Sequence, residues 1–228
     1  MPRFFDNLLS QTHVYVTLLL KACLLIGALA LFFAGQYQAV METLSILCIT
    51  FFPMILGRRF RVKITHELES LAVLFICCSL FFGEVMDFYT RYWWWDIALH
   101  IFSGFLLGIM GVLLVYVLNE DDSINFELSP GFIAFFAFTF AMAMAALWEI
   151  FEYAADQTLG LNMQKSGLQD TMWDLIVDAM GALFIAVLGY RFLLTTETDS
   201  FLERWINRFI SLNPQLFRNR GKGGSRKQ

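Results

Sequence analysis

The chain has 228 residues and a formal net charge of −4, with 58% hydrophobic residues and a mean hydropathy of +0.60. Globular domains contain about 45–50% apolar residues, so this composition excludes a largely water-soluble protein and indicates a polytopic membrane protein. The four cysteines lie in apolar runs without zinc-ligand spacing, and the basic residues carry no nucleic-acid reading motif. We therefore expect neither a disulfide framework nor nucleic-acid binding.

Six apolar segments along the chain are each near the roughly 20 residues needed to cross a bilayer. They predict an all-α bundle of six transmembrane helices at 14–34, 40–57, 68–88, 96–118, 131–155 and 171–194. The second segment is short and contains Pro53.

An amphipathic segment follows the last span. Over residues 200–212, apolar side chains fall on one helical face and two arginines on the other, which predicts a helix lying on the inner leaflet. The rest of the tail is basic, and we expect it either to attract anionic lipid or to act as a topology anchor. The predicted organisation is a six-span domain at 1–197, with its functional core at 90–194, and an interfacial helix and tail at 198–228.

The basic residues predict the orientation, because Lys and Arg concentrate on the cytoplasmic side of membrane proteins. Four of them, at 58–63, follow the second span, and more lie in the C-terminal tail. The opposite side keeps only Arg91 and Lys165, and the acidic loop 119–130 has no Lys or Arg. Both termini are therefore expected in the cytoplasm.

Acidic side chains and one histidine recur at helical spacing near one end of three spans. With the predicted orientation, all of them lie in the outer third of the bilayer. Side chains three or four residues apart share a helix face, and the set comprises Asp96 and His100; Glu149, Glu152 and Asp156; and Asp170, Asp174 and Asp178.

Some of these acids have simple structural explanations. Asp96 and Asp170 fall where helices begin and suit an N-cap, and Thr171 with Asp174 suits a capping box. Glu84 and Asp87, at the end of the third span, suit a solvated helix end.

The other acids need a different explanation. Glu149, Glu152 and Asp156 lie at the C-terminal end of a helix, where the dipole disfavours anions, and Asp178 lies beyond capping range. Carboxylates gathered in this way must take up protons or bind a cation. A divalent metal is one interpretation, and a proton or cation pathway and a purely structural polar network are the others.

The metal interpretation assigns a role to each residue. Carboxylates with one imidazole suit Mg²⁺, Mn²⁺, Zn²⁺ or Fe²⁺. The predicted ligands are His100, Glu149, Glu152, Asp174 and Asp178, and among them Glu149, Glu152 and Asp174 are the candidate catalytic acid–base groups. Asp96, Asp156 and Asp170 are expected to orient these ligands without binding the metal themselves.

Small residues and a loop complete the expected site. Gly104 and Gly108 extend the face of Asp96 and His100 and permit close helix packing, as does Gly181 after Asp178. The polar loop 157–170 is positioned to cover the acids.

Three motifs carry a family resemblance. The string from Asp96 to Gly104, then Trp148-Glu149-Ile-Phe-Glu152-Tyr153, then Gly167 to Ala182 resemble the YjdF-like family of bacterial inner-membrane proteins. The resemblance covers roughly residues 90–185 and implies the fold and an inner-membrane location. A looser similarity to VanZ-like membrane proteins rests on the same acids and histidine, with Asp178 where that pattern usually has Asn.

Three functions follow as hypotheses. The first is a metal-dependent activity on a lipid or cell-envelope substrate that enters from the outer leaflet. The second is a proton- or cation-coupled transporter or flippase, and the third is a non-catalytic envelope assembly protein. The absence of sequence-visible repeats, of a broken helix pair and of a polar series reaching the cytoplasmic side favours a pocket over a pathway.

Overall fold

The structure is a computed structural model that describes residues 2–119, 128–194 and 201–216. Within these ranges the chain forms helices and contains no strand. Six described segments are long and apolar enough to cross a membrane: Gln11–Phe33, Tyr37–Phe60, His66–Val85, Trp95–Val115, Pro130–Leu159 and Leu168–Arg191. The predicted all-α fold with six candidate spans is confirmed. The acidic loop at 120–127 and the basic tail at 217–228 lie outside the described residues.

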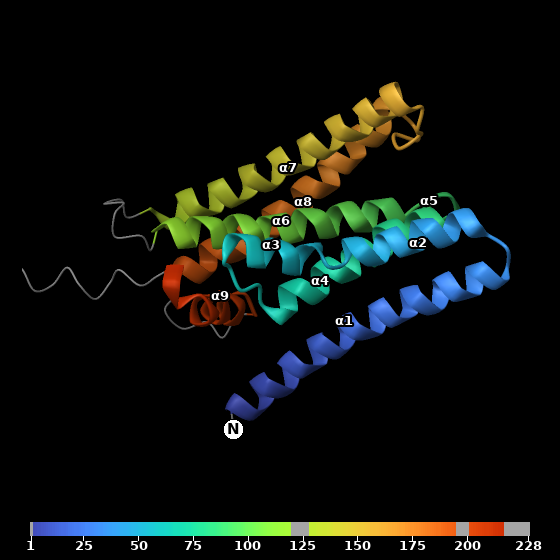
Figure 1. Cartoon of the computed structure of the whole chain (residues 1–228). Helices are drawn as coiled ribbons and strands as arrows, with labels where there is room; N and C mark the ends of the chain where they lie inside the picture. The colour runs from blue at the N-terminus through green and yellow to red at the C-terminus, as the bar shows by residue number, and fades with distance from the viewer. Residues whose placement is uncertain (1, 120–127, 195–200, 217–228) are drawn as a thin grey trace, which may run out of the picture. The chain divides into compact units, whose positions relative to one another are not determined.

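The chain forms two compact units, Met1–Trp95 and Asp96–Gln228. The first unit contains α1 (Pro2–Phe33), α2 (Tyr37–Ile49), α3 (Phe52–Phe60), α4 (His66–Ile76), the π-helix η1 (Cys77–Val85) and α5 (Phe88–Arg91) (Figure 1). Its core contains five buried side chains that come from three of the spans: Leu24, Ile46, Val73, Cys77 and Phe81.

Two spans of the first unit are irregular. The second span is interrupted between α2 and α3, because Pro53 has no backbone N–H to donate and occupies the first turn of α3. The third span changes from α4 into a π-helix, in which the hydrogen-bonding register includes one extra residue per turn. Gly83 in this π-helix gives room to the Tyr89 ring, and the Tyr89 hydroxyl lies 3.1 Å from Ser79 Oγ.

The second unit contains α6 from Asp96 onward, α7, α8 and α9, with the short 3₁₀-helix η2. Their bounds are α6 (Trp95–Asn119), α7 (Pro130–Leu159), α8 (Leu168–Leu194), α9 (Phe201–Leu212) and η2 (Pro214–Leu216). Helix α7 begins with Ser129 as its N-cap and ends at Gly160, whose left-handed backbone (φ 67°) closes the last turn. Helices α7 and α8 lie side by side (Figure 1).

Glycines bring α6 and α8 into backbone contact. A Cβ added at Gly104 would overlap the backbone carbonyl of Asp178, and one at Gly181 would overlap that of Ile101. Further along α6, a Cβ added at Gly108 would lie only 3.0 Å from the Ile185 side chain. This arrangement confirms the predicted close packing of the Gly104–Gly108 face, and it places Asp178 directly against the helix that carries His100.

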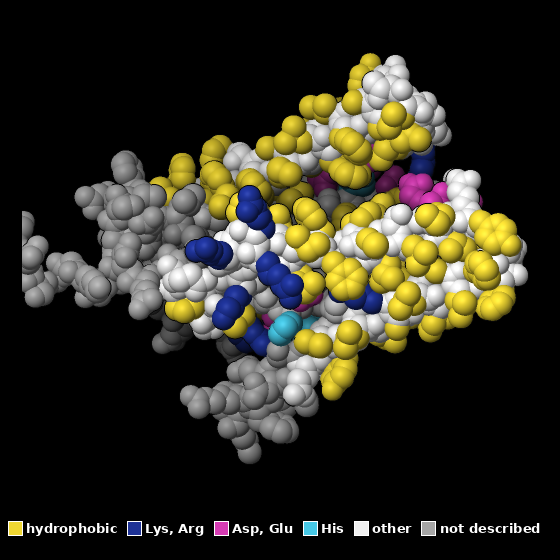
Figure 2. Space-filling model, in the orientation of Figure 1, with side chains coloured by type: hydrophobic (Ala, Val, Ile, Leu, Met, Phe, Trp, Pro, Cys, Tyr) yellow, Lys and Arg dark blue, Asp and Glu magenta, His cyan; other side chains and the backbone are white. Residues whose placement is uncertain are grey.

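The surface of the helices is mainly apolar. Large hydrophobic side chains such as Phe33, Phe135 and Leu183 are more than half exposed, and Figure 2 shows this class over most of the visible helical surface. Such a surface suits contact with lipid rather than water. Helix α9 is amphipathic, with Phe209 buried and Arg204 exposed. Its location on the inner leaflet stays a prediction.

Candidate functional site

Three helices of the second unit carry the acids and the histidine near the same end. Asp96 and His100 occupy the first two turns of α6, and Asp174 and Asp178 lie one turn apart near the start of α8. Glu149 lies toward the C-terminal end of α7. Because α6 and α8 are in backbone contact at Gly104 and Gly181, their polar turns face each other.

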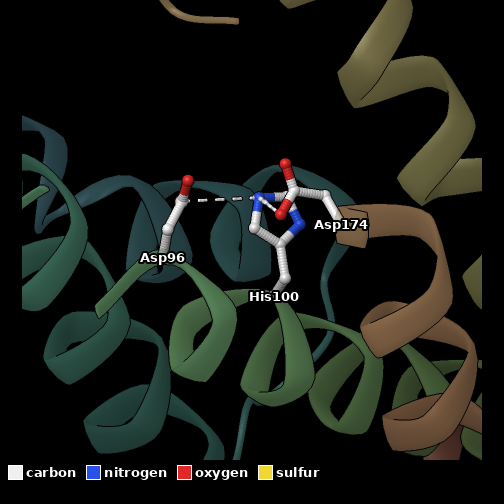
Figure 3. Close-up of side chains that lie close together, drawn as sticks. All are labelled: Asp96, His100 and Asp174. Carbon is white, nitrogen blue, oxygen red and sulfur yellow. Dashed lines mark ion pairs between the residues drawn. The ribbon is translucent and has the colours of Figure 1, made fainter. Parts of the chain in front are cut away.

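Asp96, His100 and Asp174 form one compact group (Figure 3). His100 Nε2 lies 3.7 Å from Asp96 Oδ1 and 3.8 Å from Asp174 Oδ1. These distances exceed those of a hydrogen bond. One ligand atom from each residue lies within 4.8 Å of the others, so the three are close enough to hold one metal ion.

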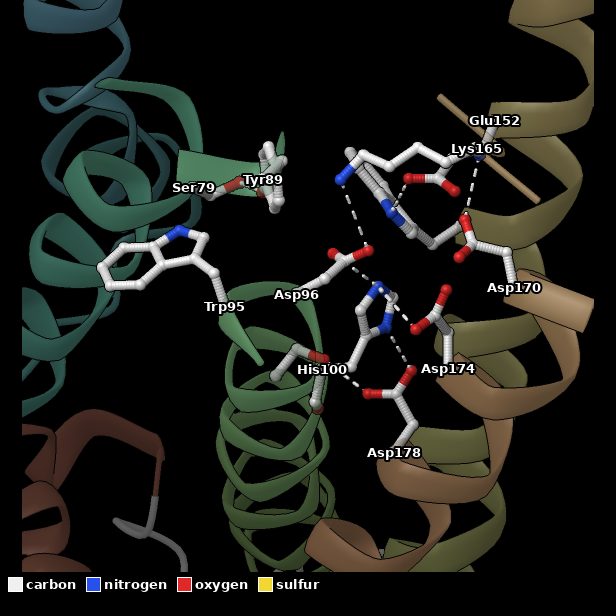
Figure 4. A network of polar contacts seen from close by, with 12 residues as sticks. Ser79, Tyr89, Trp95, Asp96, His100, Glu152, Lys165, Asp170, Asp174 and Asp178 are labelled. Carbon is white, nitrogen blue, oxygen red and sulfur yellow. Dashed lines mark hydrogen bonds and ion pairs between the residues drawn. The ribbon is translucent and has the colours of Figure 1, made fainter. Parts of the chain in front are cut away.

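The other nitrogen of the His100 ring is held by Asp178. Nδ1 lies 2.9 Å from Asp178 Oδ2, and the Asp178 side chain is 2% exposed (Figure 4). A carboxylate accepts hydrogen bonds, so this contact places a proton on Nδ1 and leaves the Nε2 lone pair of a neutral ring directed at Asp96 and Asp174. A carboxylate behind a histidine is the usual way to orient a metal ligand.

Ser103 completes this support, although the sequence motifs assigned it no role. Its hydroxyl lies 2.5 Å from Asp178 Oδ1 and 2.8 Å from the His100 carbonyl oxygen, and it donates its single proton to one of the two. Ser103 follows His100 by three residues, so helical spacing is the signal that places it on the same face.

Glu149 is a buried carboxyl that no described residue hydrogen-bonds. It is 4% exposed, and neither side-chain oxygen has a partner within the described part of the chain. The Thr171 hydroxyl lies nearby but outside hydrogen-bond geometry, and Glu149 interacts electrostatically with His100 and Asp178. A buried polar group in this condition costs stability, and a bound proton or cation would relieve that cost.

Glu152 has a different environment from Glu149. Its Oε1 accepts a hydrogen bond of 2.9 Å from the indole Nε1–H of Trp148, one turn earlier on α7. The sequence predicted both glutamates as metal ligands, but their contacts in the structure differ. Glu152 is partly exposed beside an exposed tryptophan.

Asp156 and Asp170 hold the loop between α7 and α8. Asp156 accepts hydrogen bonds from the backbone N–H groups of Met163 (2.7 Å) and Gln164 (2.9 Å). Asp170 accepts one from the N–H of Lys165 at 3.0 Å. These two carboxylates hold the loop in place and do not contact His100. The support that the structure shows for them is therefore support of the loop, not of the predicted metal ligands.

The geometry also tests two of the simple structural explanations for the acids, a capping box at Thr171 and Asp174 and a solvated helix end at Asp87. Helix α8 begins at Leu168, so Thr171 lies inside it, and the expected Thr171–Asp174 capping box is wrong. The Thr171 hydroxyl instead accepts a hydrogen bond of 2.7 Å from the Gln164 side chain. In the first unit, Asp87 is exposed and lies 3.9 Å from Arg91, which agrees with the expected solvated helix end.

One basic side chain reaches the group from the loop. Lys165 Nζ lies 3.8 Å from Asp96 Oδ2, the oxygen that does not face His100 (Figure 4). Its side chain is 33% exposed, against 6% for that of Asp174. The site thus has a buried acidic interior and a more accessible ammonium at its edge.

Residues 15–195 match the family described as "Predicted membrane protein (DUF2238)". An uncharacterized protein of Thermotoga maritima is 31% identical over 134 residues, which cover 57% of this chain and 67% of the relative. No solved structure matches the chain significantly. The family match includes every residue of the site described above, and its description states no reaction.

Proposed function

The chain belongs to this family of predicted membrane proteins, and we propose that it binds a divalent metal ion at Asp96, His100 and Asp174 and uses it for hydrolysis of a lipid or another cell-envelope amphiphile. The observation that carries the proposal is the orientation of His100. Asp178 binds its Nδ1, so its Nε2 is presented to two carboxylate oxygens at 3.7 and 3.8 Å.

The spacing of the three ligand atoms supports a shared ion. Ligands bound to one tetrahedral ion at about 2.0–2.1 Å lie roughly 3.4 Å from one another. The distances at Nε2 are slightly longer than this value, and they are too long for hydrogen bonds. Three protein ligands leave a coordination position open, which is the arrangement of catalytic rather than structural sites. This assignment exchanges the expected roles of Asp96 and Asp178, because Asp96 becomes a ligand and Asp178 a positioning residue.

Glu149 supplies the group that such chemistry needs beside the metal. A metal ion lowers the proton affinity of bound water and polarises a phosphoryl or acyl oxygen. A nearby carboxylate then removes the proton. Glu149 is buried, lacks a hydrogen-bond partner among the described residues, and interacts electrostatically with His100 and Asp178. We assign it the role of general base.

The position of the site along its helices supports a membrane substrate. His100 lies five residues after the start of α6, or about 8 Å along the helix axis. The candidate spans around it are apolar and their outer faces are exposed. The distribution of Lys and Arg and the YjdF-like resemblance support a bacterial inner-membrane protein with both termini in the cytoplasm and the site toward the outside.

A coupled transporter is the second candidate, and one observation favours it. His100 is surrounded by Asp96, Asp174 and Asp178, and an imidazole among carboxylates can take up and release a proton without a metal. In that case, the unpartnered Glu149 would be a second proton-binding group. A site that serves only assembly of the envelope would need neither turnover nor transport.

Metal content of the purified full chain tests the proposal. We expect near-stoichiometric metal by elemental mass spectrometry after dialysis against Mg²⁺, Mn²⁺ or Zn²⁺. The His100→Gln and Asp174→Asn variants should lose it while keeping their helical circular dichroism. Asp87→Asn is the matched control, because Asp87 is exposed and Asn tolerates its left-handed backbone (φ 61°). A wild-type protein that binds none of these ions refutes the metal site and directs attention to pH-dependent transport.

A further inference from the structure

We propose that Lys165, presented by the loop between α7 and α8, binds a phosphate group of the substrate beside the metal. This inference rests on the proposed function and adds the chemical class of the substrate. The shared chemistry is a phosphate ester or free phosphate, and the expected source is a phospholipid headgroup.

The loop is built to hold one conformation. Its two ends are Gly160 and Gly167, both with left-handed backbone (φ 67° and 64°), which glycine adopts without steric cost. Between them, Asp156 accepts two backbone N–H groups at 2.7 and 2.9 Å. The Gln164 side chain donates to Thr171 at 2.7 Å. These contacts tie the loop to both α7 and α8.

This conformation sets the position of Lys165. Its own backbone N–H donates to Asp170 at 3.0 Å, so the residue is anchored at its main chain while its side chain extends over the site. The ammonium reaches to 3.8 Å from Asp96 Oδ2, and the other oxygen of the same carboxylate faces His100 Nε2. Lys165 and His100 therefore approach different oxygens of one carboxylate (Figure 4).

The charge and accessibility of this side chain fit an anionic ligand. The Lys165–Asp96 pair is partly exposed, and its 3.8 Å separation exceeds hydrogen-bond distance. A phosphate that binds the open metal position would also meet the ammonium, and two positive groups on one phosphoryl group stabilise the charge of its transition state. A neutral or cationic headgroup would gain no charge attraction from Lys165.

The acidic interior explains why the cation lies at the edge. Asp174, Asp178 and Glu149 are almost fully buried, so an approaching anion is repelled until the metal neutralises part of their charge. Lys165 is the more exposed group and meets the anion first. The oxygens of Glu149 have no hydrogen-bond partner among the described residues, which is an independent sign that the interior takes a further ligand or proton.

Binding of three probes to the Mn²⁺-loaded full chain in detergent micelles tests the inference. The probes are dioctanoyl phosphatidic acid, inorganic phosphate and dioctanoylglycerol, and the readouts are ligand affinity from thermal shift and metal content. We expect phosphatidic acid to bind and dioctanoylglycerol not to bind. Lys165→Gln should weaken the affinity for phosphatidic acid about ten-fold or more, the effect of losing one charged hydrogen bond. Lys165→Arg should keep it within a few-fold.

The arms of this experiment separate the possible outcomes. Lys63→Gln is the matched control, because Lys63 is an exposed lysine of the first unit. Binding of inorganic phosphate as tightly as phosphatidic acid would identify a phosphate site that does not require a lipid, and Lys165 would still be its binding group. Equal binding of dioctanoylglycerol, or unchanged phosphatidic acid affinity in Lys165→Gln with full metal content, overturns the inference while the metal site stands. Loss of metal from the wild type refutes the proposed function itself.

Discussion

The Nδ1 atom of His100 lies 2.9 Å from Oδ2 of Asp178, and this contact joins α6 to α8 beside the glycines that bring the two backbones together. Asp178 and Asp174 are one turn apart on α8, so one helix face provides a carboxylate to each nitrogen of the same ring. The ring orientation therefore depends on the helix packing as well as on the hydrogen bond.

The first prediction concerns this contact. Asp178→Asn should lower the affinity for the metal by about 10–100-fold, the usual cost of removing the carboxylate behind a metal-bound histidine. Ser103→Ala should have a smaller effect, because it removes one hydrogen bond from Asp178 and leaves the bond to His100 in place. Titration of purified protein with Mn²⁺, followed by electron paramagnetic resonance, measures both. Unchanged affinity in Asp178→Asn would show that the His100 ring needs no such support.

The second prediction concerns the unpartnered carboxyl of Glu149. In metal-free protein, Glu149→Leu should raise the free energy of unfolding by about 1–3 kcal/mol, because a buried group without a hydrogen bond is replaced by an apolar one. Glu152→Leu is the control and should bring no gain, since it removes the bond from Trp148. Unfolding midpoints in detergent with a chelator provide the measurement. A less stable Glu149→Leu protein would mean that Glu149 has a stabilising partner.

The sequence predicted two of the residue pairs in the site, because helical spacing determines the face on which a side chain lies. Asp96 with His100, and Asp174 with Asp178, were each expected on one face, and the structure brings the two pairs together. The six apolar segments and the Gly104–Gly108 packing face were predictable for the same reason. The interruption at Pro53 follows from the missing N–H of proline.

The roles within the site were less predictable. Spacing does not determine how a helix is rotated about its axis relative to its neighbour. It therefore could not predict which nitrogen of His100 each carboxylate contacts: Asp178 binds Nδ1, and Asp96 faces Nε2. Asp156 and Asp170 bind loop N–H groups whose positions depend on the turn at 160–167. The π-helix Cys77–Val85 has no compositional signal, because the segment is mostly apolar on all sides and a change of helical register leaves no mark in its sequence.

The third prediction tests the backbone contact between α6 and α8. Gly104→Ala should destabilise the protein by roughly 1–3 kcal/mol, because the new methyl group overlaps the Asp178 carbonyl in a rigid helix. Gly131→Ala is the matched control, since its nearest neighbour would be the Tyr190 ring at 3.9 Å. Thermal unfolding of both variants in the same detergent gives the comparison. Equal midpoints would show that the two helices can move apart without cost.

The fourth prediction concerns the loop that carries Lys165. Asp156→Ala removes the acceptor of two backbone N–H groups, so the amides of Met163 and Gln164 should exchange with solvent at least ten-fold faster. Amides in the middle of α7 should be unaffected. Hydrogen exchange read by mass spectrometry resolves the two regions. If exchange at Met163 and Gln164 stays slow in the variant, other contacts hold the loop.

The fifth prediction concerns the side of the membrane that the site faces. Lys and Arg cluster after the second span, at Arg58, Arg59 and Lys63, while Lys165 lies on the loop at the site, and the positive-inside rule assigns these two loops to opposite sides. Single cysteines introduced as Lys63→Cys and Lys165→Cys should therefore differ in their reactivity with a membrane-impermeant maleimide added to intact spheroplasts. Only Lys165→Cys should react before the membrane is permeabilised.

This labelling needs a cysteine-free background, because Cys23 and Cys48 are exposed and could themselves react with the maleimide. Cys77 is buried in the core of the first unit, so Cys77→Ala needs a check of folding before use. Reaction of Lys63→Cys alone would place the site on the cytoplasmic side. The metal ligands would be unchanged, but the substrate would then have to come from the inner leaflet.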